Sequence, residues 1–175
     1  MSKFTKINFL HVLARNVPLI LLFISVLNEF DFNYLEIKYF SFNFPFILIF
    51  YSSLKKSNYI GYGYIFLAGL INDAVVGLPI GISSLTYLLI CGFAAYLRNI
   101  TLRPSLFKDW LFFLFTILVV NSLIYIILIL FFSVNIDYYS SMVNLAFTFF
   151  LYLFFAQIFK FYFDNYLLSQ GRYYD

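Results

Sequence analysis

Asp73 is the side chain in this sequence with the clearest capacity for chemistry, because it is a carboxylate inside a long apolar run that begins near Tyr59. A carboxylate in membrane hydrocarbon costs about 2.5 to 3.5 kcal/mol at a helix centre, so neighbouring groups must satisfy it. Three roles are open for it. It can be a protonated or hydrogen-bonded group that fastens two helices, a contact to a partner protein, or a step in the passage of an ion or substrate.

The residues around Asp73 predict a helical hairpin. Gly69, Asp73 and Gly77 recur every four residues, so they lie along one face of a helix. Gly77, Pro79 and Gly81 then stop one helix and start the next, which predicts a tight turn between two spans. Small residues on the following span are expected to let the two helices approach closely. They are Gly81, Ser84, Cys91, Gly92 and Ala95.

The other polar residues do not suggest an enzyme. His11 is the single histidine and Cys91 the single cysteine, so neither predicts a metal site. No serine is paired with a base, no two carboxylates share a predicted span, and no phosphate-binding glycine loop is present. We therefore expect no catalytic activity, no cofactor and no metal. Amides and hydroxyls of the last two spans are expected to form interhelical hydrogen bonds, worth about 0.6 kcal/mol each. These are Asn121, Ser122, Asn144, Thr148 and Gln157.

The composition predicts an integral membrane protein. Hydrophobic residues make up 63% of the 175 residues and charged residues 11%, whereas soluble domains carry about 25% charged residues. We expect one all-α transmembrane domain over residues 1–175 in contact with membrane lipids. The 26 Phe and 16 Tyr are expected mostly to face lipid or the membrane interface. The net charge of +3 does not require a nucleic-acid partner, because the positions of the basic residues explain it.

At about 20 residues per span, the apolar runs predict a bundle of six transmembrane helices. The second is the weakest, because its apolar core from Pro45 to Leu54 is short for a membrane core of about 30 Å. Six spans place ten of the eleven basic residues on the cytoplasmic side, so both termini are predicted to be cytoplasmic. The expected spans are 9–28, 42–57, 59–76, 79–97, 110–132 and 141–162.

A pattern in the predicted hairpin, G-L-x-x-D followed by G-x-P-x-G, resembles the hallmark of the bacterial rod shape-determining protein MreD family. Its residues are Gly69, Leu70, Asp73, Gly77, Pro79 and Gly81. The length, the six spans, the proline-led second span at Pro45 with Lys55 and Lys56 after it, and the basic loop from Arg98 to Asp109 are also similar to that family.

The resemblance implies a non-enzymatic scaffold subunit of the complex that elongates the cell and synthesises peptidoglycan. It would be a multi-pass protein of the bacterial inner membrane. The implied partners are a bitopic protein like MreC and, in the wider complex, MreB filaments and RodA with a penicillin-binding protein.

The same resemblance supplies a second hypothesis, because the MreD fold is similar to that of the S-components of energy-coupling-factor transporters. The chain would then be the substrate-binding membrane subunit of a transporter for a vitamin or another small molecule. Those proteins carry alanines every four residues on the first span to dock their transport partner. Here Ala14 stands alone beside Arg15, Asn16 and Pro18, so the scaffold is favoured, and a small-molecule or lipid pocket between the helices stays open. An ion pathway is weaker still, because only Asp73 and Asn121 are candidates and they lie on different helices.

Overall fold

The computed structural model describes residues 16–27, 41–55, 60–100, 105–134 and 137–162, and every regular element in this part of the chain is a helix. The prediction of an all-α fold is confirmed. From α2 onward the helix ends differ from the expected bounds by at most four residues. The helices are Asn16–Leu27, α2 (Phe44–Lys55), α3 (Tyr62–Val76), α4 (Ile82–Ile100), α5 (Leu106–Phe132) and α6 (Tyr138–Tyr162).

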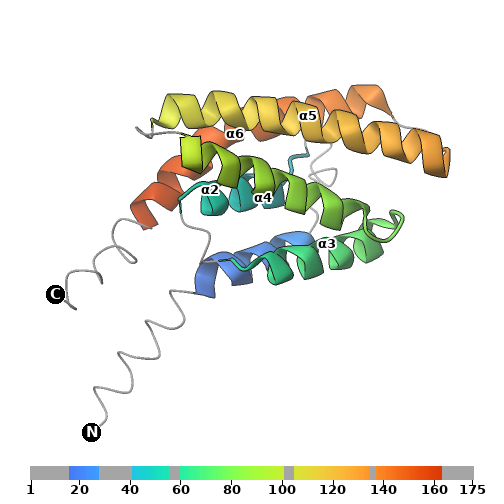
Figure 1. Ribbon diagram of the computed structural model, residues 1–175, viewed down its shortest axis with the longest axis horizontal. Coiled ribbons are helices and arrows are strands. Elements are labelled where there is room, and N and C mark those ends of the chain that lie inside the picture. The colour runs from blue at the N-terminus through green and yellow to red at the C-terminus, as the bar shows by residue number, and fades with distance from the viewer. Residues whose placement is uncertain (1–15, 28–40, 56–59, 101–104, 135–136, 163–175) are drawn as a thin grey trace, which may run out of the picture.

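The helices alternate in direction along the chain (Figure 1). The helix Asn16–Leu27, α3 and α5 run one way, and α2, α4 and α6 run the other way. The end of the bundle that holds the α3–α4 turn, the end of α5 and the start of α6 is called the hairpin end below, and it lies on the right in Figure 1. Helix α4 packs against α2, α3 and α5, and α6 packs against α2 and α5.

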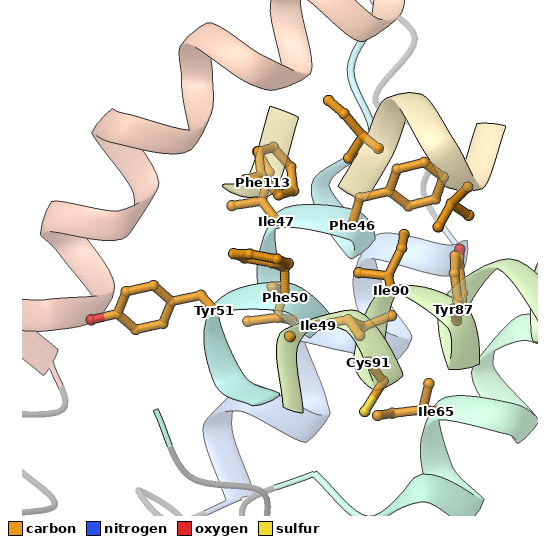
Figure 2. Close-up of a cluster of buried hydrophobic side chains, with 14 of the residues drawn as sticks. Phe46, Ile47, Ile49, Phe50, Tyr51, Ile65, Tyr87, Ile90, Cys91 and Phe113 are labelled. Atoms are coloured by element: carbon orange, nitrogen blue, oxygen red, sulfur yellow. The ribbon is translucent and has the colours of Figure 1, made fainter. Parts of the chain in front are cut away.

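Helix α2 lies at the centre of the bundle, although the sequence marked it as the weakest span. Eleven of its twelve residues are buried. The Phe50 ring lies against Phe113 of α5 (Figure 2), with ring centroids 5.1 Å apart. It also lies against Tyr152 of α6, with ring centroids 5.8 Å apart. Twelve residues extend only about 18 Å as an α-helix. Because neighbouring helices surround α2, this short helix is covered by protein on nearly every side.

Aromatic side chains also hold α5 and α6 together. The Trp110 and Phe149 rings stack with centroids 4.4 Å apart, and Trp110 Nε1 donates a hydrogen bond to the Phe149 carbonyl at 3.0 Å. Phe113 and Tyr152 are fully buried and stack at 4.5 Å. These rings are exceptions to the expectation that the aromatic residues mostly face lipid, because they stack between helices.

Helices α5 and α6 are long and apolar enough to cross a membrane, with 27 and 25 residues. By length and composition they are the two helices of the described residues that meet this test. Much of their surface points away from the bundle and is apolar, including Leu130, Phe131 and Phe150. Soluble monomers rarely expose contiguous apolar patches of more than a few hundred Å². Such surfaces suit contact with lipid or with another protein.

Charged residues meet at the end of the bundle opposite the hairpin end. Lys55 Nζ in the last turn of α2 lies 3.8 Å from Asp109 Oδ2, and the Asp109 side chain is buried. Arg98 Nη1 donates a hydrogen bond to the Ser53 carbonyl at 3.1 Å and so caps α2. The expected loop from Arg98 to Asp109 is therefore shorter than predicted, because α4 continues to Ile100 and Asp109 belongs to the first turn of α5.

Candidate functional site

The Asp73 side chain binds the start of the next helix. It is fully buried, its Oδ2 accepts a hydrogen bond from the Gly81 N–H at 2.6 Å, and its Oδ1 accepts one from the Ser83 N–H at 2.8 Å. The first N–H groups of a helix have no acceptor inside the helix and form the positive end of its dipole. Both carboxyl oxygens are therefore used to cap α4.

The main chain of the same residue ends α3. The Asp73 carbonyl accepts hydrogen bonds from the N–H groups of Gly77 and Leu78, at 2.9 Å and 3.0 Å. Gly77 has φ +75°, the left-handed conformation that commonly terminates a helix. Asp73 thus ends α3 through its carbonyl and begins α4 through its carboxylate, with Pro79 in the turn between them.

Gly77 is required for its backbone conformation rather than for packing, which corrects part of the predicted stripe. It is exposed, and a Cβ added to it would meet no atom within 4 Å. The four-residue spacing placed it correctly at the end of the helix but wrongly on the contact face. Gly81, with φ +104°, also adopts a conformation that favours glycine.

Replacing Gly77 with alanine is expected to lower the free energy of unfolding by about 1 kcal/mol, because a Cβ disfavours the left-handed conformation. Gly77→Asn should lose less, since asparagine tolerates this conformation better. Denaturant unfolding of the purified protein measures both changes. An alanine variant as stable as the native protein would contradict the proposed requirement for glycine in the left-handed conformation at position 77.

Gly69 is the point of closest approach between α3 and α4. It is buried, and a Cβ added to it would overlap the Cα and N atoms of Ser84. Ser84 Oγ donates a hydrogen bond back to the Phe66 carbonyl at 2.9 Å. On the predicted small face of α4, Ser84 and Cys91 are buried, whereas Gly92 is exposed and has no atom within 4 Å of an added Cβ.

The hairpin is a structural clamp by its geometry. A carboxylate has two oxygens and acts only as an acceptor, and here each oxygen already accepts a backbone hydrogen bond. Both oxygens therefore take part in the bonds that start α4. Of the three roles open from the sequence, fastening two helices is the one that these distances support.

A second set of polar residues lies at the hairpin end, and the sequence did not predict that they bond to one another. Asn43, just before α2, donates from Nδ2 to Asn144 Oδ1 at 2.7 Å, and its N–H donates to Thr148 Oγ1 at 3.0 Å. Asn144 Nδ2 donates to Ser41 Oγ at 2.7 Å. The prediction that Asn144 and Thr148 tie α6 to the bundle is confirmed. The available signal was Asn43 ahead of Pro45, a helix-start pattern.

The predicted interhelical bonds of Asn121, Ser122 and Gln157 are wrong, because none of these side chains forms a hydrogen bond within the described residues. Ser122 and Gln157 are exposed and point away from the neighbouring helices, whereas Asn121 is half-buried. Predictions made for His11, Ala14 and Arg15 lie outside the part of the chain that the structure describes.

Comparisons of the chain with protein-family models, with curated proteins and with solved structures give no match. The description of the site therefore depends on its residues and distances. These define an all-helical bundle with a clamped hairpin and a polar group at one end.

Proposed function

We propose that this chain is a scaffold subunit of the bacterial machinery for cell elongation and peptidoglycan synthesis, similar to MreD. It acts by binding rather than by catalysis. The observation that carries the proposal is the use of both Asp73 oxygens by the amides of α4, at 2.6 Å and 2.8 Å. The motif that suggests the family therefore has one structural role, which is to form a rigid hairpin.

A six-span placement in the inner membrane, with both termini cytoplasmic, accompanies this proposal. It is supported by the alternating helix directions, by the length of α5 and α6, and by their exposed apolar faces (Figure 1). The central position of α2 is compatible with its short length, because protein rather than lipid surrounds it. Exposed apolar faces of this kind are suited to lateral contact with transmembrane helices of other proteins.

The partners proposed are a bitopic protein like MreC and, through the wider complex, MreB filaments and RodA with a penicillin-binding protein. The α5 and α6 faces are the contact surface that we favour, because they carry large exposed side chains such as Phe131, Phe150 and Phe161. Aromatic residues contribute strongly to binding energy when a partner covers them.

A substrate-binding subunit of a small-molecule transporter is the second candidate. The specific observation in its favour is a cavity of about 440 Å³ at the hairpin end, within the size range of small-molecule sites. Affinity purification of the full chain from its own cells separates the two functions. A transport ATPase as the recovered partner would support the transporter and contradict the scaffold.

Depletion in the native cell tests the scaffold directly. Rod-shaped cells are expected to become round when the protein is depleted, and a plasmid copy of the native chain should restore rods. A copy carrying Gly92→Ala is the matched control, because Gly92 lies away from the contact between α3 and α4. Unchanged cell outline after depletion would contradict the proposed function.

A further inference from the structure

The cavity at the hairpin end is lined by side-chain amides from four elements. Asn43 lies before α2, Asn72 on α3, Asn121 on α5 and Asn144 on α6, and the space between them is called the asparagine cavity here. Its volume is about 440 Å³. An adjoining hollow of about 270 Å³ shares three of these amides and extends to Ser140 and Ser141 in the first turn of α6.

The chemistry of the lining selects for an uncharged ligand. Among the described residues that line the asparagine cavity, none is Asp, Glu, Lys, Arg or His. The nearby Asp73 carboxylate is occupied by the amides of α4 and is not part of the lining. A charged ligand in surroundings this apolar would lose its hydration without gaining a counter-charge.

Asn121 has unused hydrogen-bonding capacity. It is half-buried near the middle of α5, lines both hollows and forms no hydrogen bond with any residue in the described part of the chain. A carboxamide can donate two hydrogens and accept at its oxygen. These groups are free to bond to a ligand, because Asn121 lines both hollows.

The other amides are held in place but not saturated. Asn43 and Asn144 are bonded to each other at 2.7 Å, and Asn72 Nδ2 donates to Ser83 Oγ at 2.9 Å. Each retains a second N–H or an oxygen lone pair that these bonds do not use. Such fixed groups lose little side-chain freedom when a ligand binds, which favours affinity.

The amides come from different segments of the bundle, and aromatic rings also line the cavity. Phe46 and Tyr87 pack edge to face at 6.0 Å, and Tyr125 of α5 also lines the cavity. A ligand that bonds to amides from several helices must carry several polar groups. A flat heteroaromatic molecule with one polar edge would leave most of the amides unused.

We propose that the asparagine cavity binds an uncharged sugar ring, with the amides bonded to its hydroxyl groups and the aromatic rings against its C–H faces. The ring can come from a free sugar or from the headgroup of a glycolipid, since both present the same chemistry. This proposal goes beyond the scaffold function and does not depend on it.

The test uses the purified full chain in a phosphocholine detergent, which carries no sugar. In one arm methyl β-glucoside is titrated, and in the other the protein is placed in phosphatidylcholine nanodiscs with or without monoglucosyl diacylglycerol. We expect a saturable rise of the unfolding midpoint in at least one arm, because a ligand of the folded state stabilises by mass action. Cyclohexanol, which has the ring but a single hydroxyl, should give no saturable rise.

Variants at Asn121 make the result specific to the cavity. Asn121→Leu is expected to weaken binding about tenfold, the value of one good hydrogen bond, without lowering the midpoint of the unliganded protein. Asn121→Gln places a longer side chain in the cavity and should also weaken binding. Ser122→Ala is the matched control, because Ser122 is the next residue and is exposed away from the cavity.

Absence of a saturable rise in both arms would overturn the proposal, as would binding that both Asn121 variants leave unchanged. A rise confined to the nanodisc arm identifies a glycolipid, and a rise with methyl β-glucoside identifies a free sugar. Failure of sugar binding would leave the effect of depletion on cell shape intact, so the two proposals fail separately.

Discussion

Replacing Asp73 with leucine is expected to lower the free energy of unfolding by about 2 to 6 kcal/mol, the cost of leaving two backbone donors without acceptors. Leucine matches an apolar setting but leaves the N–H groups of Gly81 and Ser83 without their acceptors at the buried start of α4. Asp73→Asn keeps one carbonyl acceptor and should fall between leucine and the native residue. Denaturant unfolding of the purified protein, together with its abundance in membranes, measures the effect.

Asp137 provides a matched control for this experiment. It also caps a helix, with Ser140 Oγ donating to its Oδ2 at 2.6 Å and the Tyr139 N–H donating to its Oδ1 at 3.1 Å, but it is exposed. Asp137→Leu should therefore have a much smaller effect, since water can replace the carboxylate. If Asp73→Leu unfolds no more readily than Asp137→Leu, the clamp is not what holds the hairpin.

The pH of the comparison matters because of Asp137. The Ser140 hydroxyl, and then the Ser140 N–H, lower the pKa of the Asp137 carboxyl below its ordinary value. A group with a lowered folded pKa stabilises the protein above its unfolded pKa and loses that contribution as the pH falls through the folded pKa. At pH 7 the contribution of Asp137 is fully present, so the comparison with Asp73 belongs there.

Gly69→Ala is the second substitution with a large expected effect, about 3 kcal/mol, the upper part of the usual range for overpacking. A single added methyl group would overlap the Ser84 backbone, and no change of side-chain rotamer relieves a clash with backbone. The helices α3 and α4 would have to separate. Unfolding free energy measures this loss, and crosslinking between cysteines placed on the two helices measures the separation.

Gly92→Ala on α4 is the matched control for Gly69→Ala. An added Cβ at Gly92 meets no atom within 4 Å, and alanine favours a helix over glycine by about 1 kcal/mol. The same chemical change should therefore stabilise the protein slightly at Gly92 and destabilise it at Gly69. Changes of the same sign at both positions would contradict the close approach of α3 and α4.

The α3–α4 hairpin was predictable from the sequence because its signals are local. Glycines and a proline mark the turn, and a lone acid in an apolar run must find donors nearby. Spacing alone could not separate the two helical glycines. Gly69 is needed for a close contact and Gly77 for its φ value, and both occur at the same four-residue interval.

The central position of α2 and the asparagine cavity were not predictable in this way. A helix that is apolar all round has the same sequence pattern whether lipid or protein surrounds it. The twelve residues of α2 therefore do not indicate that the helix is enclosed by protein. Asn43 and Asn144 are 101 residues apart in the chain, and no local pattern pairs them. Charge asymmetry cannot reveal a cavity whose described lining residues carry no charge.

The enclosure of α2 constrains how the protein is made. The ribosome completes α2 at Lys55, but α6, which covers one of its sides, is finished only at Tyr162. At usual synthesis rates these 107 residues take about 5 to 20 s. During that interval this short apolar helix lacks one of its final neighbours, and its surface on that side stays uncovered until α6 is complete.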